Sequence, residues 1–339
     1  MTPTITPVAP MPPLSRCRRS MVSALVLSPL LHGEVQAQSS TTYPAESVKM
    51  IVPYAAGGAT DIVARAVAEK MTGVWSKPVI IENKPGAGTT LAAAQFARMP
   101  GDGHSLYMTT SAHTISASMY KKLDYDTLKD FAPLTLVARV PLVLVVRPDL
   151  NVKSLAEFIK YVQANPDKVS YASPGNGTAQ HLAGEMFNTA LKSRVVHVPY
   201  KGDAPAITDL MGGTVDAMFA TLTVVIPHIE SGKLKALALA NGTRVEKVPG
   251  IPTFAEAGMS NFEFATWFGV FAPASMPRNL REQISQDIRT VVLKPDLRKS
   301  LIDMGGEVVG NRPAEFEAFV LTESRKWQEA VRASGAQVN

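Results

Sequence analysis

The stretch VPYAAGGATDIVAR, residues 52–65, changes from a strand-like to a helix-like pattern across two glycines. The apolar run 48–54 predicts a buried strand, and the pattern that follows Asp61 predicts an amphipathic helix. Gly57 and Gly58 lie between them. Glycine lets a backbone approach a ligand closely, and the N–H groups of a first helical turn attract anions. The stretch therefore predicts a β/α unit with an anion-binding turn.

The same alternation continues along the chain at intervals that suit βαβ units. We expect strands at 47–54, 78–82, 104–110, 141–147, 168–172, 195–199, 215–220, 234–240 and 264–272. This order predicts parallel sheets covered by helices, in which ligands bind beyond the carboxyl ends of the strands.

Helical patterns occupy 61–73, 178–191 and 204–211. We expect Asp203 to cap the third of these, with Pro205 in its first turn and Gly212-Gly213 at its end. The tail, 278–334, predicts helices only, with breaks at Pro295 and at 305–306.

The first 37 residues have the pattern of a secretory signal peptide, although a disordered tail is the alternative. Basic residues precede an apolar segment at 21–31, which is shorter than the roughly 20 residues of a membrane-spanning helix. Cleavage after Ala37 would remove Cys17, the only cysteine. We therefore expect a periplasmic protein of about 300 residues, enough for two lobes, with neither disulfides nor thiolate chemistry.

Charge argues against nucleic-acid binding. The formal net charge is +5, and the basic residues are scattered rather than clustered. A nucleic-acid-binding surface requires a concentrated basic patch.

Three glycine-containing loops, at 53–61, 83–90 and 172–181, each follow a predicted strand and precede a predicted helix. They are neither dinucleotide fingerprints nor P-loops, because Leu91 and Gln180 replace the third glycine and no GxxxxGK[ST] occurs. One such loop is usually an ordinary turn, but three favour anion binding. Asp61 is most simply an N-cap, whereas Thr178 suits a cap and a ligand contact equally.

Catalytic patterns are missing from the sequence. There is neither a GxSxG elbow nor an HExxH pair. His181 and Glu185 could share a metal ion, but no second ligand motif accompanies them. We expect His197 in the core or at its rim, and Trp267 and Phe268 as packing residues, with an aromatic at a cleft mouth as the alternative. The sequence predicts no catalytic residue, metal or cofactor.

Six ordered blocks resemble the Bug/TctC-type solute-binding proteins of tripartite tricarboxylate transporters. These blocks are YPAESVKMIVPYAAGGATDIVAR, VIIENKPGAGTTLAAAQFA, KDFAPLTLVARVPLVLVV, VSYASPGNGTAQHLAGEMF, VHVPYKGDAPAITDLMGGTVDAMF and PTFAEAGMSNFEFATWFGVFAPASMP. The resemblance runs from about Tyr43 to the C-terminus. It implies an α/β, two-lobed, type II periplasmic-binding-protein (Venus flytrap) fold with a ligand cleft between the lobes. We expect lobe 1 at 43–142 plus 268–339 and lobe 2 at 143–267.

The resemblance also implies that loops of both lobes receive a ligand carboxylate. The implied ligand-binding residues are Tyr54, Gly57, Gly58, Ala59, Thr60, Ser111, Ser173, Asn176, Gly177, Thr178, Ala220 and Thr221. Two departures from the family pattern matter. Its usual FPPGG is YAAGG here, which adds the hydroxyl of Tyr54. Its frequent MFDN is MFAT here, so Ala220 and Thr221 stand where an acidic residue could hold a ligand amine.

The resemblance therefore predicts a monomeric receptor for a small organic carboxylate, aliphatic or aromatic, that lacks an amino group. Its partners would be the large and small integral membrane subunits of a transporter. The alternative is a sensor component that feeds a signalling system, and an exported hydrolase is a third reading.

Overall fold

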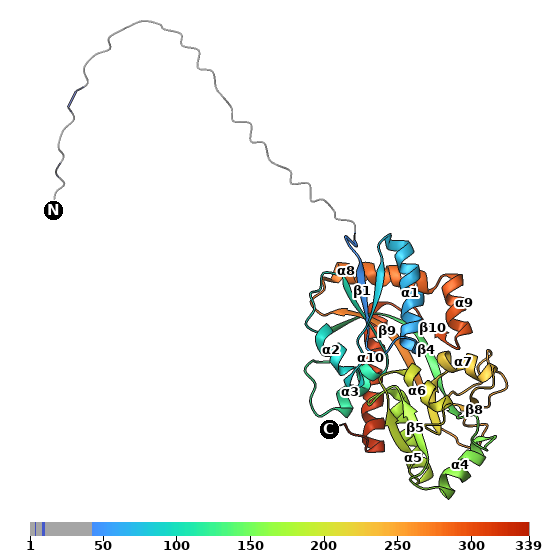
Figure 1. The fold of residues 1–339 in the computed structure, drawn as a ribbon. Helices are drawn as coiled ribbons and strands as arrows, with labels where there is room; N and C mark the ends of the chain where they lie inside the picture. Colours follow the sequence, from blue (N-terminus) through green and yellow to red (C-terminus); the bar gives the residue numbers. More distant parts are fainter. Residues whose placement is uncertain (1–3, 5–8, 11–42, 339) are drawn as a thin grey trace. The chain divides into compact units, whose positions relative to one another are not determined.

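The computed structural model describes residues 43–338 together with residues 4, 9 and 10, and Figure 1 shows its helices and strands. The predicted signal peptide falls almost wholly outside these residues and stays a prediction. Within the described part of the chain, no helix combines the length and the apolar character that crossing a membrane requires.

All nine predicted strands are confirmed. The structure adds an earlier start of one strand and a tenth, short strand. The strands are β1 Val48–Val52, β2 Val79–Asn83, β3 Ser105–Thr109, β4 Phe131–Val146, β5 Ser170–Ser173, β6 Val196–Pro199, β7 Ala217–Thr221, β8 Lys235–Leu239, β9 Ala265–Pro273 and β10 Glu307–Val308. β4 begins far before the predicted residue 141, and β-bulges interrupt its early pairing with β9. The prediction of helices only in the tail was wrong, because the two residues of β10 pair with β4.

Helices follow most strands. They are α1 Ala59–Trp75, α2 Thr90–Phe96, α3 Ala112–Met119, α4 Leu155–Ala164, α5 Ala179–Leu191, α6 Asp203–Met211, α7 Leu222–Glu230, α8 Arg278–Val292, α9 Pro295–Asp303 and α10 Pro313–Ser334, with a 3₁₀ turn at Ala87–Thr89. The expected breaks at Pro295 and at 305–306 are confirmed.

Helix capping corrects two predictions and confirms a third. The N-cap of α1 is Gly58, and Asp61 lies inside the helix, where its Oδ2 accepts the N–H of Gly57 at 2.9 Å. Gly202 is the N-cap of α6, and Asp203 is the first residue of the helix. No described side chain caps this helix end. Thr178 does cap α5, since its Oγ1 accepts the N–H of His181 at 3.2 Å.

The ten strands form one mixed sheet in the order β2-β1-β3-β9-β4-β7-β5-β6, with β8 and β10 also paired to β4. The pairs β1–β2, β1–β3, β5–β6 and β5–β7 are parallel, as predicted. The prediction of purely parallel sheets was wrong, because β3–β9 and every pairing of β4 are antiparallel.

Strand β4 changes its neighbours along its length. Residues 131–141 pair with β9. Residues 142–146 pair with β7 on one side, and residues 143–146 pair with β8 on the other. The change of partner falls between residues 141 and 142. The residue limits of the two lobes stay a prediction.

Helix α10 links two of the hydrophobic clusters. Trp267 packs with Phe271 and Phe316 in one cluster, whereas Trp327 packs with Phe264 in another. Glu323 of α10 is only 7% exposed. Its Oε2 accepts hydrogen bonds from the indole of Trp267 at 3.1 Å and from that of Trp327 at 2.7 Å. Trp267 is therefore a packing residue, as predicted, and one carboxylate joins the two clusters.

We expect Glu323→Ala to destabilise the protein strongly. It would leave two buried indole N–H groups without an acceptor, at a cost of about 1–3 kcal/mol each. Thermal unfolding measured by circular dichroism should show a melting point lower by several degrees. Glu329→Ala, on an exposed position of the same helix, is the matched control. Equal melting points for the two variants would contradict this role.

Candidate functional site

The first glycine loop packs directly against the loop that precedes α6. The N–H of Ala55 donates to the carbonyl of Lys201 at 3.0 Å. The N–H of Ala59, in the first turn of α1, donates to Oδ2 of Asp203 at 3.0 Å. Because Asp203 begins α6, the N-terminal ends of α1 and α6 meet at this carboxylate.

The other two glycine loops are also in contact. A Cβ added at Gly88 would lie 2.2 Å from the carbonyl oxygen of Asn176, and Gly88 has φ +57°. A Cβ at Gly175 would lie 3.2 Å from the carbonyl oxygen of Tyr200. Only glycine fits Gly88 without displacing the facing loop. The loops 53–61 and 172–181 thus both contact the loop 200–204, and the loop 83–90 contacts the loop 172–181.

Hydrogen bonds hold the third glycine loop, 172–181, in shape. We call it the second binding loop, because the resemblance assigns ligand contacts to it and to the first loop. Oγ1 of Thr178 donates to the carbonyl of Gly175 at 2.8 Å, and the N–H of Gly177 donates to Nδ1 of His181 at 3.3 Å. The ring of His181 stacks on His197 with centroids 3.9 Å apart. Nε2 of His197 lies 2.6 Å from Oγ of Ser173. The two histidines therefore fix the loop through their hydrogen bonds to Ser173 and Gly177.

These histidines are held in their neutral form. Burial lowers the pKa of His181 to about 4, and burial together with the neighbouring His181 lowers that of His197 to about 3. A neutral ring can accept the N–H of Gly177, as an imidazolium cannot. His197 lies in β6 at the rim of the core, as predicted, and Ser173 beside it is completely buried.

Three of the other predicted site residues use their hydroxyl groups in hydrogen bonds to residues outside the predicted set. The hydroxyl of Tyr54 is 2.8 Å from Oγ1 of Thr110, and Oγ of Ser111 is 3.3 Å from Oγ1 of Thr266. Oγ1 of Thr221 accepts from Gln180 at 2.9 Å. Ala220 is fully buried in β7. Their ligand-binding role stays a prediction.

Asp203 is the residue that sequence reasoning misread. In the sequence it has the position of an ordinary helix cap, but its side chain reaches across to α1 instead. It is 5% exposed, and burial raises the pKa of its carboxyl to about 6. Only the tertiary contact between loops far apart in the sequence reveals it.

No group of three or more His, Cys, Asp or Glu side chains suited to a metal ion occurs among residues 43–338 and the three described near the N-terminus. Nε2 of His181 and Oε1 of Glu185 lie 3.9 Å apart. The carboxylate of Glu185 accepts instead from the hydroxyl of Tyr171 at 2.7 Å.

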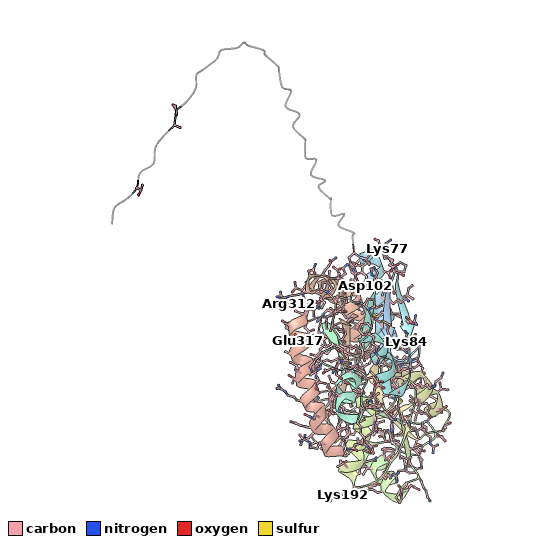
Figure 2. The ribbon with its side chains drawn as sticks, turned by 90° about the vertical axis from the view of Figure 1, so that its left-hand side faces the viewer. Lys77, Lys84, Asp102, Lys192, Arg312 and Glu317 are labelled. Carbon is pink, nitrogen blue, oxygen red and sulfur yellow. The ribbon has the colours of Figure 1, made fainter. Side chains whose placement is uncertain are left out.

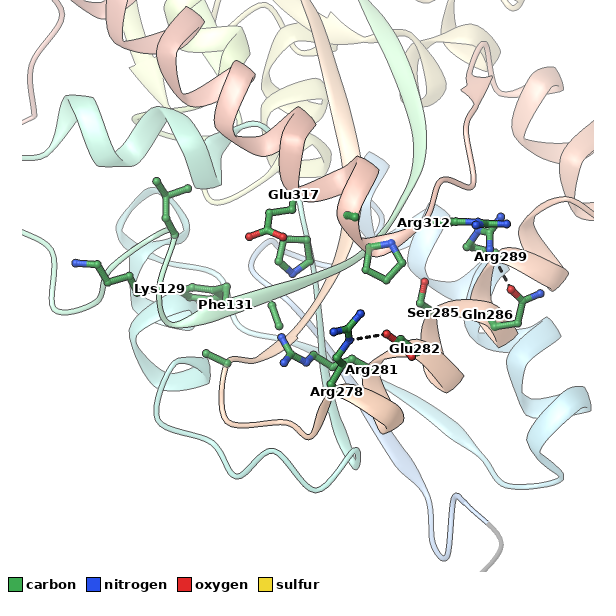
Figure 3. Close-up of a pocket in the computed structure, with 16 residues that line it drawn as sticks. Lys129, Phe131, Arg278, Arg281, Glu282, Ser285, Gln286, Arg289, Arg312 and Glu317 are labelled. Atoms are coloured by element: carbon green, nitrogen blue, oxygen red, sulfur yellow. Dashed lines mark hydrogen bonds and ion pairs between the residues drawn. The ribbon is translucent and has the colours of Figure 1, made fainter.

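A cavity of about 700 Å³ lies elsewhere, and Figure 3 shows its lining. Arg278, Arg281, Arg289 and Arg312 contribute to it, and Figure 2 places Arg312 and Glu317 at the start of α10. Its floor includes the first residues of β4, 131–133, which the strand register puts at the opposite end of the sheet from the loop after β1. None of its lining residues belongs to the glycine loops.

Two β/α halves that share β4, with helix N-termini converging on glycine loops, define the class of periplasmic-binding-protein folds. The model of the family described as the tripartite tricarboxylate transporter family receptor matches residues 63–336. The chain belongs to this family.

Solved structures agree with this assignment. The periplasmic binding protein BugD is 36% identical, with a TM-score of 0.84 over 87% of this chain and 99% of that chain. Rpa4515 of R. palustris, solved with adipate, is 30% identical, with a TM-score of 0.85 over 87% of this chain and 100% of that chain. MatC from Rhodopseudomonas palustris, with bound malate, is 33% identical, with a TM-score of 0.82 over 85% of this chain and 100% of that chain. The type II periplasmic-binding-protein fold expected from the sequence is thereby confirmed.

We expect stability to fall as the pH drops from about 6.5 to about 4. Burial lowers the pKa of His113 and His181 to about 4 and contributes to the pKa of about 3 at His197, so in this window the unfolded chain binds protons that the folded protein does not. Asp203 opposes the trend, because its raised pKa of about 6 lets the folded state bind a proton first. Three histidines outweigh one carboxyl.

Urea unfolding at pH 7.0, 5.5 and 4.5 measures this dependence. Asp203→Asn should steepen the decline by removing the opposing group. A free energy of unfolding that is constant or increases as the pH falls would contradict the neutral state of the buried histidines.

Proposed function

We propose that this protein is a periplasmic receptor that binds a small organic carboxylate, aliphatic or aromatic and without an amino group. It delivers this acid to a tripartite tricarboxylate-type transporter. The observation that carries the proposal is the convergence of the glycine loops and helix N-termini in a chain of this family. The adipate and malate found in two similar proteins agree with a carboxylate ligand.

A carboxylate suits these loops for an electrostatic reason. The first turns of α1 and α5 present N–H groups and the positive ends of helix dipoles. Hydrogen bonds to a charged acceptor contribute roughly 1.5–3 kcal/mol, more than neutral ones. We assign ligand contacts to the twelve residues expected from the sequence: Tyr54, Gly57, Gly58, Ala59, Thr60, Ser111, Ser173, Asn176, Gly177, Thr178, Ala220 and Thr221.

The preference for an acid without an amino group rests on Ala220 and Thr221. Neither side chain carries a charge that could hold an ammonium group at the end of β7. We further propose that residues 1–37 direct export, that the protein works as a monomer without catalysis, and that integral membrane subunits accept the ligand.

A melting-point screen against organic acids and their amides tests the carboxylate requirement. At 100 times its dissociation constant, a ligand adds roughly 2.7 kcal/mol of stability. We expect one or a few acids to raise the melting point by about 2–4 °C or more, and their neutral amides to have little effect. Equal shifts with acids and amides would refute binding through the charge.

Gly58→Asp tests the first loop directly. A Cβ at Gly58 would lie 3.2 Å from Oδ2 of Asp203, so a new carboxylate there meets both a like charge and the expected ligand. We expect this variant to lose the ligand-induced shift. Gly73→Asp is the matched control, because it makes the same substitution on α1 where a Cβ would meet no atom within 4 Å. Normal ligand binding by Gly58→Asp would show that the loop is only a turn.

A further inference from the structure

The carboxyl group of Asp203 is buried with one oxygen unused. Oδ2 accepts the N–H of Ala59 at 3.0 Å, whereas Oδ1 is buried and has no hydrogen-bond partner among the described residues. A buried polar atom without a partner is rare and calls for a water, a proton or a ligand donor to complete it. Oδ1 thus marks an unfilled acceptor position beside the first glycine loop.

This carboxyl group occupies the position that a ligand anion would take. It lies at the N-terminal ends of both α1 and α6, and a Cβ at Gly58 would be 3.2 Å from its Oδ2. The N–H of Ala59 is therefore already satisfied by the protein's own acid. A ligand carboxylate at the same N–H group would face a like charge in a buried environment, where such repulsion is strong.

No basic side chain among the described residues is in an ion pair with the carboxyl group of Asp203. Asp61 on α1 is paired with Arg65, and Lys201 on the adjoining loop is exposed. The hydroxyl of Tyr54 bonds to Thr110 rather than to Asp203. The carboxyl group is consequently stabilised by the N–H of Ala59 and by the helix ends, and burial raises its pKa to about 6.

We propose that Asp203 determines ligand class: the site prefers monocarboxylates that bear a hydroxyl group, and it discriminates against ligands that bring a second carboxylate to the first loop. This proposal rests on the proposed function. The ligand's carboxylate would bind at residues 173–178 of the second binding loop. The second binding loop contacts Tyr200, three residues before Asp203, and the proposal places one small ligand across both loops.

A hydroxyl group suits Oδ1 in either protonation state of Asp203. It donates to the charged carboxylate and accepts from the protonated acid. An ammonium group can pair only with the charged form, and burying that ion pair costs the desolvation of both charges. A second carboxylate requires the protonated form, so its binding should strengthen below the pKa of Asp203.

Matched ligands in a titration-calorimetry series separate these cases. Two chain lengths are used, with 4-hydroxybutanoate, butanoate, succinate and 4-aminobutanoate in one set and 6-hydroxyhexanoate, hexanoate, adipate and 6-aminohexanoate in the other. At pH 7.5 we expect the hydroxy acid of at least one set to bind tenfold or more tightly than its dicarboxylate and its amino analogue. Lowering the pH to 5.5 should strengthen dicarboxylate binding severalfold.

Asp203→Asn should remove most of this difference, raising dicarboxylate affinity about tenfold and abolishing the part of the pH dependence that Asp203 causes. Asp203→Ser is a second variant that removes the charge with a smaller side chain. Asp209→Asn is the matched control, because Asp209 lies on the same helix but accepts the hydroxyl of Tyr200 instead. Circular dichroism melting verifies that each variant folds.

The outcomes distinguish this inference from the proposed function. If the hydroxy acid and the dicarboxylate bind with the same ratio of affinities in the wild type and in both Asp203 variants, the role of Asp203 is overturned and the receptor function stays intact. Tighter binding of an amino acid than of the hydroxy acid also overturns the assignment. If no acid of either set binds any form of the protein, the proposed function fails, and this inference fails with it.

Discussion

The long antiparallel strand β4 is the element on which the rest of the structure depends. Its first part pairs with β9 and its last part with β7 and β8. The strand β4 thereby joins the two parallel βαβ halves in one sheet. The carboxyl ends of β1 and β5 consequently lead into loops that face each other, and the glycine loops meet as a result.

The N-terminal ends of α1 and α6 meet where these loops come together, and the carboxyl group of Asp203 lies between them. Helix N-termini that point at one another concentrate partial positive charge. Asp203 lies at that position and bonds to Ala59. The second loop is ordered differently, by the neutral ring of His181 and the hydroxyl of Thr178. The first loop thus has the protein's own carboxyl group beside it, whereas the second does not, and this asymmetry distinguishes the two parts of the candidate site.

Packing also joins the two halves away from the loops. Glu323 accepts from Trp267 and Trp327, which belong to different hydrophobic clusters. Both indoles are buried, so their N–H groups need an acceptor inside the protein. A single side chain of α10 therefore couples the packing of elements far apart in the sequence.

Local patterns in the sequence determined where strands and helices form, which loops carry the glycines, and that Thr178 caps α5. These features depend on neighbouring residues, so hydrophobic period and turn chemistry suffice to predict them. The early half of β4, strand β10 and the direction of β9 depend on pairing with distant segments, which no local pattern encodes. Asp203 shows the same limit most clearly. Its sequence position is that of a helix cap, and only the approach of α1 turns it into a buried carboxyl group beside the first glycine loop. Tertiary structure alone decided this role, because burial and partnership are properties of contacts between segments far apart in the chain.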